Sequence, residues 1–475
     1  MAVKNNRIYW IVWLLLSSLL GAWLAHAMLN ENADKQIFMP GELSPGHHQL
    51  ADACGACHID AFGGGEVLQR ACVDCHGEDR VKPFDSHPAK KFKDPRNADL
   101  LASIDALQCI GCHEEHKPEI TAKDGLTQPL DLCFHCHQEI AEDRPSHQGM
   151  GFDTCKDSGC HNYHNNRALY TDFLIKHLDE DPLLDQGVLP SKEFASLLEE
   201  IIEYPREEYP VVRLDEDDID ASERRAFDQD ISTEWLETAH ARSGVNCSAC
   251  HMQARDKAQE PSWNDHPDHT VCENCHSVEV SRFFKGKHGM RLQQGLSPMT
   301  PDQAVLPMKQ EARHTSLTCT SCHGSHRFDV KKAAVEACLE CHDDKHSLAY
   351  EASPHYRLWQ QELLAKAETG TGVSCASCHM PRVSRDVSEW MSRIVVDHNQ
   401  SANLSPNSKM IRSSCLHCHG LEYSLSALAD QSLIENNFSG APAGQQVQSM
   451  QLAKKESIRR QEEASDDEDA DMFGF

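Results

Sequence analysis

The chain has 475 residues and a formal net charge of −29, from 45 basic and 74 acidic residues. A nucleic acid is therefore excluded as a partner, because its phosphates and the chain repel each other. Aromatic residues make up only 6% of the chain, so its side chains supply less apolar interior than a chain of this length normally buries.

The N-terminus carries an apolar run over residues 8–25, preceded by Lys4 and Arg7. Ala25-His26-Ala27 fits a small-x-small cleavage site and so favours a removed signal peptide. The run is nevertheless longer than a usual signal core and approaches the ~20 residues that span a bilayer. We therefore predict an uncleaved signal anchor over residues 1–29, with the rest of the chain in the periplasm because the positive charges stay inside.

The 22 cysteines form eleven pairs, each followed at once by a histidine, which we number as motifs 1 to 11 in chain order. Ten motifs have two residues between the cysteines, and motif 5 has four. In order, the motifs consist of Cys54, Cys57 and His58; Cys72, Cys75 and His76; Cys109, Cys112 and His113; Cys133, Cys136 and His137; Cys155, Cys160 and His161; Cys247, Cys250 and His251; Cys272, Cys275 and His276; Cys319, Cys322 and His323; Cys338, Cys341 and His342; Cys375, Cys378 and His379; and Cys415, Cys418 and His419.

The spacing C-x-x-C-H is typical of covalent attachment of haem c. Residues i, i+3 and i+4 share a face of one helical turn, so both thiols can bond the haem vinyl groups while the imidazole reaches the iron. A zinc site or a disulfide framework gives no reason for a histidine after every pair. We predict eleven haems c, with the longer gap of motif 5 looping outward, and assembly outside the cytoplasm.

The motifs fall into two clusters, which predicts a pentahaem domain over residues 30–177 and a hexahaem domain over residues 239–435. Residues 178–238 between them are acidic and carry no motif, so this segment is either a solvated connector or an acidic docking surface. Residues 436–475 are expected to be a disordered acidic tail. The predicted fold is mainly α, with short motif-bearing helices, extensive loops, little β structure and a core formed by packed haems.

Eighteen histidines lie outside both the motifs and the predicted signal anchor, enough to give each of eleven irons a second imidazole. An iron with two histidines passes electrons at low potential, whereas a catalytic iron needs an open position. The second ligands that we expect are His87, His116, His147, His164, His240, His288, His314, His326, His355 and His398. Three of them, His116, His164 and His326, follow a motif histidine at i+3 and would therefore bind a neighbouring haem.

The remaining candidates are His47, His48, His135, His177, His266, His269, His346 and His417. His135 and His417 are disfavoured because they lie between the two cysteines of a motif, where the haem crowds them.

Each cluster resembles a different kind of multihaem cytochrome. Residues 109–116 (Cys-Ile-Gly-Cys-His-Glu-Glu-His) and the wide motif 5 resemble the class III cytochromes, which are electron carriers. Residues 372–381 (Gly-Val-Ser-Cys-Ala-Ser-Cys-His-Met-Pro) and 244–252 (Gly-Val-Asn-Cys-Ser-Ala-Cys-His-Met) resemble sites of the superfamily that holds pentahaem nitrite reductase, hydroxylamine oxidoreductase and octahaem tetrathionate reductase. The lysine-ligated C-x-x-C-K site of the nitrite reductases is missing, which puts nitrite reduction to ammonia in doubt.

These observations favour an electron-transfer cytochrome anchored in the inner membrane. Its expected partners are a quinol-linked membrane donor and other cytochromes or a terminal reductase, and we assign it no catalytic residue. The alternative, implied by the second resemblance, is a multihaem oxidoreductase that acts on hydroxylamine, tetrathionate or sulfite at a haem of the second cluster. A structural filament is a third possibility, which an anchor and an acidic tail disfavour.

Overall fold

The structure is a computed structural model. It describes residues 7–30, 35–60, 63–80, 87, 94–99, 105–122, 125–129, 131–144, 147–150, 163–164, 169–185, 187–191, 207, 212–222, 229–253, 260–388, 391–404, 407–443 and 448–472. Contacts divide the chain into two compact units, residues 1–79 with 89–129 and residues 80–88 with 130–475. The predicted domain boundaries depend on where haems are attached, and they stay a prediction.

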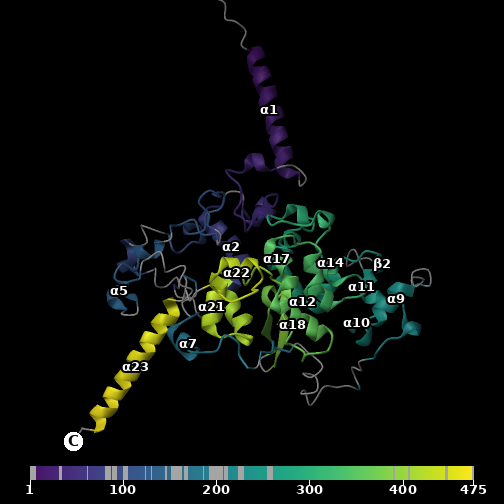
Figure 1. Cartoon of the computed structure of the whole chain (residues 1–475). Helices are drawn as coiled ribbons and strands as arrows, with labels where there is room; N and C mark the ends of the chain where they lie inside the picture. The colour runs from purple at the N-terminus through teal and green to yellow at the C-terminus, as the bar shows by residue number, and fades with distance from the viewer. Residues whose placement is uncertain are drawn as a thin grey trace, which may run out of the picture. The chain divides into compact units, whose positions relative to one another are not determined.

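The first unit begins with α1 (Arg7–Leu29), the long purple helix of Figure 1. Within the described part of the chain, this is the helix that is long and apolar enough to cross a membrane, with a mean hydropathy of 1.9 and exposed apolar side chains. A signal sequence has the same length and composition, so the helix is either an anchor or a signal sequence. The rest of this unit consists of α2 (Gly65–Arg80) and short 3₁₀ turns: η1 (Gln36–Phe38), η2 (His48–Leu50), η3 (Cys54–Ala56), η4 (Pro95–Asn97) and η5 (Cys109–Gly111).

The second unit is built from short helices joined by loops, as Figure 1 shows. Its helices are α5 (Ile140–Asp143), α7 (Thr171–Lys176), α9 (Gln229–Leu236), α10 (Ala239–Arg242), α11 (Cys247–His251), α12 (Thr270–Lys285), α13 (Met290–Gln293), α14 (Cys319–His323), α15 (Val330–Ala334), α16 (Glu336–Leu339), α17 (Lys345–Ala349), α18 (Pro354–Leu363), α19 (Cys375–His379), α20 (Met410–Ser413), α21 (Leu421–Ala429), α22 (Gln431–Glu435) and α23 (Gln448–Met472). Its 3₁₀ turns are η6 (Leu132–His135), η8 (Glu216–Asp218), η9 (Pro301–Gln303), η10 (Gln310–Ala312), η11 (Tyr350–Ala352), η12 (Asn407–Lys409) and η13 (Cys415–His417).

Strands are confined, in the described residues, to two antiparallel pairs. β1 (Met252–Gln253) pairs with β2 (Ser262–Trp263), and β3 (Arg382–Ser388) pairs with β4 (Met391–Val396). The second pair starts with Arg382 opposite Val396 and has a register shift between Asp386 and Ser388. The predicted fold class, mainly α with loops and little β structure, is confirmed.

A hydrophobic core forms where α7, α20, α21 and α23 meet, which we call the C-terminal core. Its buried residues are Leu169, Leu174, Met410, Ile411, Leu421, Leu425, Leu428, Met450 and Ala453. A smaller cluster joins Val335, Tyr350 and Trp359. The prediction that haems alone form the interior is therefore incomplete, because part of the second unit is stabilised by ordinary apolar burial.

The structure differs from the predicted disordered tail over residues 448–472, which form α23. Met450 and Ala453 lie three residues apart on one helical face, and only 3% and 2% of their surfaces are exposed. Two ion pairs add to this contact, Arg460 with Asp172 at 2.8 Å and Lys454 with Asp179 at 3.5 Å. The start of this helix is thus part of the C-terminal core despite the acidic composition that follows.

The described ends of the acidic connector lie against the second cluster of motifs. At one end the Leu184 amide donates to the carbonyl of Cys418 at 2.9 Å, and the His419 ring lies 2.8 Å from the carbonyl of Pro182. At the other end the Ser248 amide donates to the carboxylate of Asp220 at 2.9 Å. These ends are packed parts of the second unit; residues 192–206, 208–211 and 223–228 lie outside the described residues.

Candidate haem sites

Each described motif lies in a helical turn, as its spacing requires. The amide of the motif histidine donates to the carbonyl of the first cysteine at 2.8 to 3.0 Å in motifs 1, 3, 4, 9 and 11. Motifs 6, 8 and 10 coincide with α11, α14 and α19, and Asn246 and Ser374 cap α11 and α19 by accepting amide hydrogen bonds. The two cysteines and the histidine are therefore presented on one face.

The structure places eight motif histidines about 6 Å, centroid to centroid, from a second histidine. The pairs, with the distances between ring centroids, are His47 and His76 (5.9 Å), His87 and His137 (6.1 Å), His240 and His276 (6.0 Å), His251 and His326 (5.9 Å), His288 and His342 (6.3 Å), His323 and His398 (6.3 Å), His346 and His379 (6.0 Å), and His355 and His419 (6.2 Å). Every pair joins one histidine of a motif with one histidine outside the motifs. All six motifs of the second cluster are included.

This separation fits two imidazoles on opposite sides of one metal ion. A histidine nitrogen lies about 2 Å from a bound transition metal and about 1.1 Å from its own ring centroid, so two opposed rings have centroids roughly 6 Å apart. Simple ring packing prefers particular interplanar angles. Here the angle varies from 12° to 88° while the separation stays nearly constant, so the separation is what the pairs share.

Five of the paired rings have a backbone partner at Nδ1. The Nδ1 atoms of His87, His251, His346, His398 and His419 lie 2.5 to 2.9 Å from carbonyl oxygens of other residues. A ring that donates from Nδ1 to a carbonyl has Nε2 available as a metal ligand and is held in one orientation. The backbone therefore fixes these imidazoles in the tautomer that binds iron.

His47 is held by a carboxylate instead. Glu115 Oε1 lies 2.6 Å from His47 Nδ1, and the Ser44 amide donates to Glu115 Oε2 at 2.8 Å. Burial raises the pKa of Glu115, but the hydrogen bonds from His47 and Ser44 outweigh it and bring the pKa down to about 2. Glu115 is therefore ionised and orients the His47 ring.

Several of the paired rings are buried deeply enough to be neutral. Burial, followed by the nearby imidazoles, lowers the pKa of His288 and of His379 to about 4. Burial and His419 do the same for His355. The neutral form is the one that binds a metal, so these rings are prepared as ligands at neutral pH.

Six of the ten expected second ligands occur in these pairs: His87, His240, His288, His326, His355 and His398. His326 faces His251 of motif 6 and not its own motif, as its position at i+3 requires. Two further partners, His47 and His346, were not among the ten. Sequence alone offered only a weak signal for them, since both lie close to a motif in a polar stretch.

The other four expected ligands are placed differently. His314 is on the surface, with 78% of its side chain exposed, and lies 3.9 Å from Asp302. The Nδ1 of His116 lies 2.9 Å from the carbonyl of Gly41. His147 is partly buried near His137 and Arg144, which together with burial lower its pKa. His164 lies edge-on to Tyr163, with ring centroids 5.3 Å apart. Motif 5 lies outside the described residues.

Sulfur atoms of successive motifs lie close together. In the second cluster, Cys272 lies close to Cys319, and Cys338 lies close to Cys375. The intervening steps are electrostatic contacts of Cys250 with Cys272, Cys322 with Cys338, and Cys378 with Cys418. In space, each of motifs 6 to 10 therefore lies next to the motif that follows it in the sequence. No disulfide joins any of the described cysteines.

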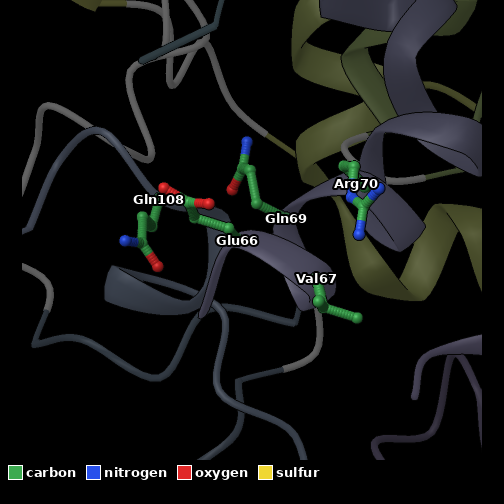
Figure 2. Close-up of a pocket in the computed structure, with 5 residues that line it drawn as sticks. All are labelled: Glu66, Val67, Gln69, Arg70 and Gln108. Atoms are coloured by element: carbon green, nitrogen blue, oxygen red, sulfur yellow. The ribbon is translucent and has the colours of Figure 1, made fainter. Parts of the chain in front are cut away.

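A hollow of about 520 Å³ lies beside the start of α2 and is lined by Glu66, Val67, Gln69, Arg70 and Gln108. Figure 2 shows that Arg70 and Gln108 lie at opposite ends of this group. No cysteine or histidine lines the hollow, so it is separate from the histidine pairs. Gln69 has a structural role, because its side-chain oxygen accepts the amide of Cys109 at 2.7 Å and so joins motif 3 to α2.

Comparison with known proteins agrees with this geometry. The cytochrome c3 family model matches residues 46–138, which contain motifs 1 to 4, and residues 311–389, which contain motifs 8 to 10. No curated protein and no solved structure matches the chain. The match supports a multihaem c-type cytochrome with covalently bound haem c. In both halves the matched model is the cytochrome c3 model, and the resemblance of the second half to the other superfamily stays an expectation.

Proposed function

We propose that this chain is a periplasmic electron-transfer cytochrome with eleven haems c, held at the inner membrane by α1. Haem iron supplies one-electron chemistry when it is bound by the motifs. The observation that carries the proposal is the set of eight histidine pairs, each with one motif histidine and one other. At these eight sites, two histidines on the iron would leave no position for a substrate.

The protein's own residues keep the sites close and rigid. Backbone carbonyls and Glu115 hold the outer nitrogens of the imidazoles, which limits ring motion during a change of charge at the iron. Motifs 6 to 11 lie next to one another in chain order, since cysteines of successive motifs are close together. Short steps between neighbouring sites favour rapid electron exchange along the chain.

The second cluster gives the alternative, a small-molecule oxidoreductase, no specific support. Each of its six motif histidines, including His251 and His379 of the segments with the second resemblance, faces another imidazole. A catalytic iron needs an open or displaceable position. We therefore favour electron transfer for both clusters.

The partners follow from charge and position. With a net charge of −29, the chain favours a redox partner with a basic contact surface over an acidic one. An anchor in the inner membrane would place it within reach of a quinol-linked donor, and other cytochromes or a terminal reductase would receive the electrons.

Two measurements on the purified full chain test the proposal. Mass spectrometry of the matured protein should show eleven covalent haems, including one at motif 5. Electron paramagnetic resonance of the oxidised protein should show low-spin iron throughout. A substantial high-spin signal together with turnover of hydroxylamine, tetrathionate or sulfite would refute the proposal and establish the oxidoreductase.

A further inference from the structure

The histidine pairs of the two clusters follow the same order along the chain. His47 lies seven residues before Cys54, the first cysteine of motif 1, and faces His76 of motif 2. His240 lies seven residues before Cys247, the first cysteine of motif 6, and faces His276 of motif 7. In both clusters, then, a histidine that precedes the first motif pairs with the second motif.

The order continues at the fourth motif of each cluster. His87 lies between motifs 2 and 3 and faces His137 of motif 4. His288 lies between motifs 7 and 8 and faces His342 of motif 9. Both partners skip one motif, a crossing that neither the spacing nor helical periodicity imposes.

The sulfur contacts also match. Cys57 is in electrostatic contact with Cys75, as Cys250 is with Cys275. Cys72 lies close to Cys109, as Cys272 does to Cys319. The first three motifs of each cluster are therefore joined by the same kind of contact at the same step.

Motifs 3 and 8 share an unusual backbone conformation. Each is followed at i+3 by a histidine, His116 or His326, and both of these residues have a φ of 63°. Positive φ is uncommon in residues other than glycine, so its occurrence at the same motif position indicates the same local turn. In the second cluster this turn directs His326 to His251 of motif 6.

From this agreement we propose that motifs 1 to 4 repeat the arrangement of motifs 6 to 9, and that His116 is the second ligand of the iron at motif 1. The inference rests on the proposed function, since it assigns a ligand to one of its haems. The described residues do not place the His58 and His116 rings in one of the 6 Å pairs, so the repeat carries the assignment. His116 is oriented for it, because Nδ1 is held by the Gly41 carbonyl and Nε2 is the atom left to bind.

By its position in the sequence, His147, between motifs 4 and 5, corresponds to His346, which lies between motifs 9 and 10. Motif 11, with its partner His355, has no counterpart in the first cluster.

The test replaces single histidines in the full-length matured chain and counts high-spin irons by electron paramagnetic resonance. We expect His116→Ala to convert one haem in eleven to high spin, the same result as for the matched variant His326→Ala. His314→Ala, at an exposed histidine without a place in the repeat, should convert none. A His116→Ala protein that keeps all its irons low-spin would overturn the assignment.

If the alanine variant fails to attach its haems, the variant His116→Met provides a second test. Here we expect full haem content, with one bis-histidine signal replaced by the optical and magnetic signature of a histidine–methionine haem. Full haem content with an unchanged spectrum would count against His116 as a ligand. Haem content by mass spectrometry separates this result from a failure of the proposed function, which would show as fewer than eleven haems in the unmodified chain.

Discussion

Asp397 and Arg282 form a buried ion pair beside His398, and we expect its loss to weaken both the fold and one histidine pair. Arg282 on α12 donates from Nε and Nη2 to the two carboxylate oxygens of Asp397, each at 2.8 Å. Their side chains are 12% and 8% exposed. Asp397 follows β4 directly, and the next residue, His398, faces His323 of motif 8 at 6.3 Å. The pair therefore fixes the end of the β3–β4 hairpin to the helix that carries motif 7.

The variant Asp397→Leu leaves the Arg282 guanidinium buried without its bidentate acceptor. Removing one partner of a buried pair costs about 3–5 kcal/mol. At about 1.4 kcal/mol per factor of ten, the unfolding equilibrium constant should rise roughly 100- to 3,000-fold. Arg385, whose Nη2 lies 4.0 Å from Asp397, is a second cation that loses this carboxylate and cannot accept a hydrogen bond from Arg282. We also expect partial high-spin character at motif 8, because the backbone that positions His398 is loosened.

Denaturant unfolding of the haem-loaded protein, followed by circular dichroism and by haem absorbance, measures both effects. The double variant Arg282→Met with Asp397→Leu is the control, since replacing both charges by apolar side chains is often neutral or stabilising. It should recover most of the lost stability. A single variant that costs less than about 1 kcal/mol, the range of solvated surface pairs, would refute the reasoning, as would a double variant no more stable than the single one.

Three other predictions follow from the described contacts. Met450→Ala, in the buried start of α23, should cost about 2–5 kcal/mol in denaturant unfolding, whereas Ile458→Ala on the same helix, 49% exposed, should stay within ~0.5 kcal/mol; equal effects would mean that the helix does not pack. His355→Ala should convert one haem to high spin in paramagnetic resonance, because its ring faces a motif histidine at 6.2 Å, and an unchanged spectrum would contradict that pairing. Replacing residues 1–29 by a cleavable signal peptide should move the protein from the membrane to the soluble periplasmic fraction, and an unmodified chain already found there would show that α1 is removed.

The attachment half of each site could be read from the sequence, because it is local. Two cysteines and a histidine within five residues share one helical turn whatever the rest of the chain does. The hydrogen bond from the His137 amide to the Cys133 carbonyl, at 3.0 Å, closes that turn. Helix α1 could also be read from the sequence, because it follows from one continuous run of apolar residues.

The second histidines could not be read in this way. His314 and His398 both stand among polar residues, and the sequence made them equally good candidates. His314 follows the short turn η10 and is left on the surface, whereas the β3–β4 hairpin returns His398 to motif 8. The group that a histidine contacts depends on a partner many residues away. The residues next to the histidine in the sequence do not identify that partner.

At the C-terminus, composition predicted disorder where the structure has helix α23. The acidic residues after position 465 dominate the average and suggest disorder, although Met450 and Ala453 have the spacing of a buried helical face. Whether such a face is used depends on α7 and α21 being present to cover it.

By itself, then, the sequence determined the number and kind of attachment motifs, the acidic charge and the α-helical class, since each follows from composition or from contacts within one turn. Only the tertiary structure decided which imidazoles meet and which cysteines lie side by side, and its two described pairs in the first cluster match two pairs of the second. Those properties arise from long-range folding, in which residues 29 to 75 positions apart, such as His47 and His76 or His251 and His326, are brought to one site.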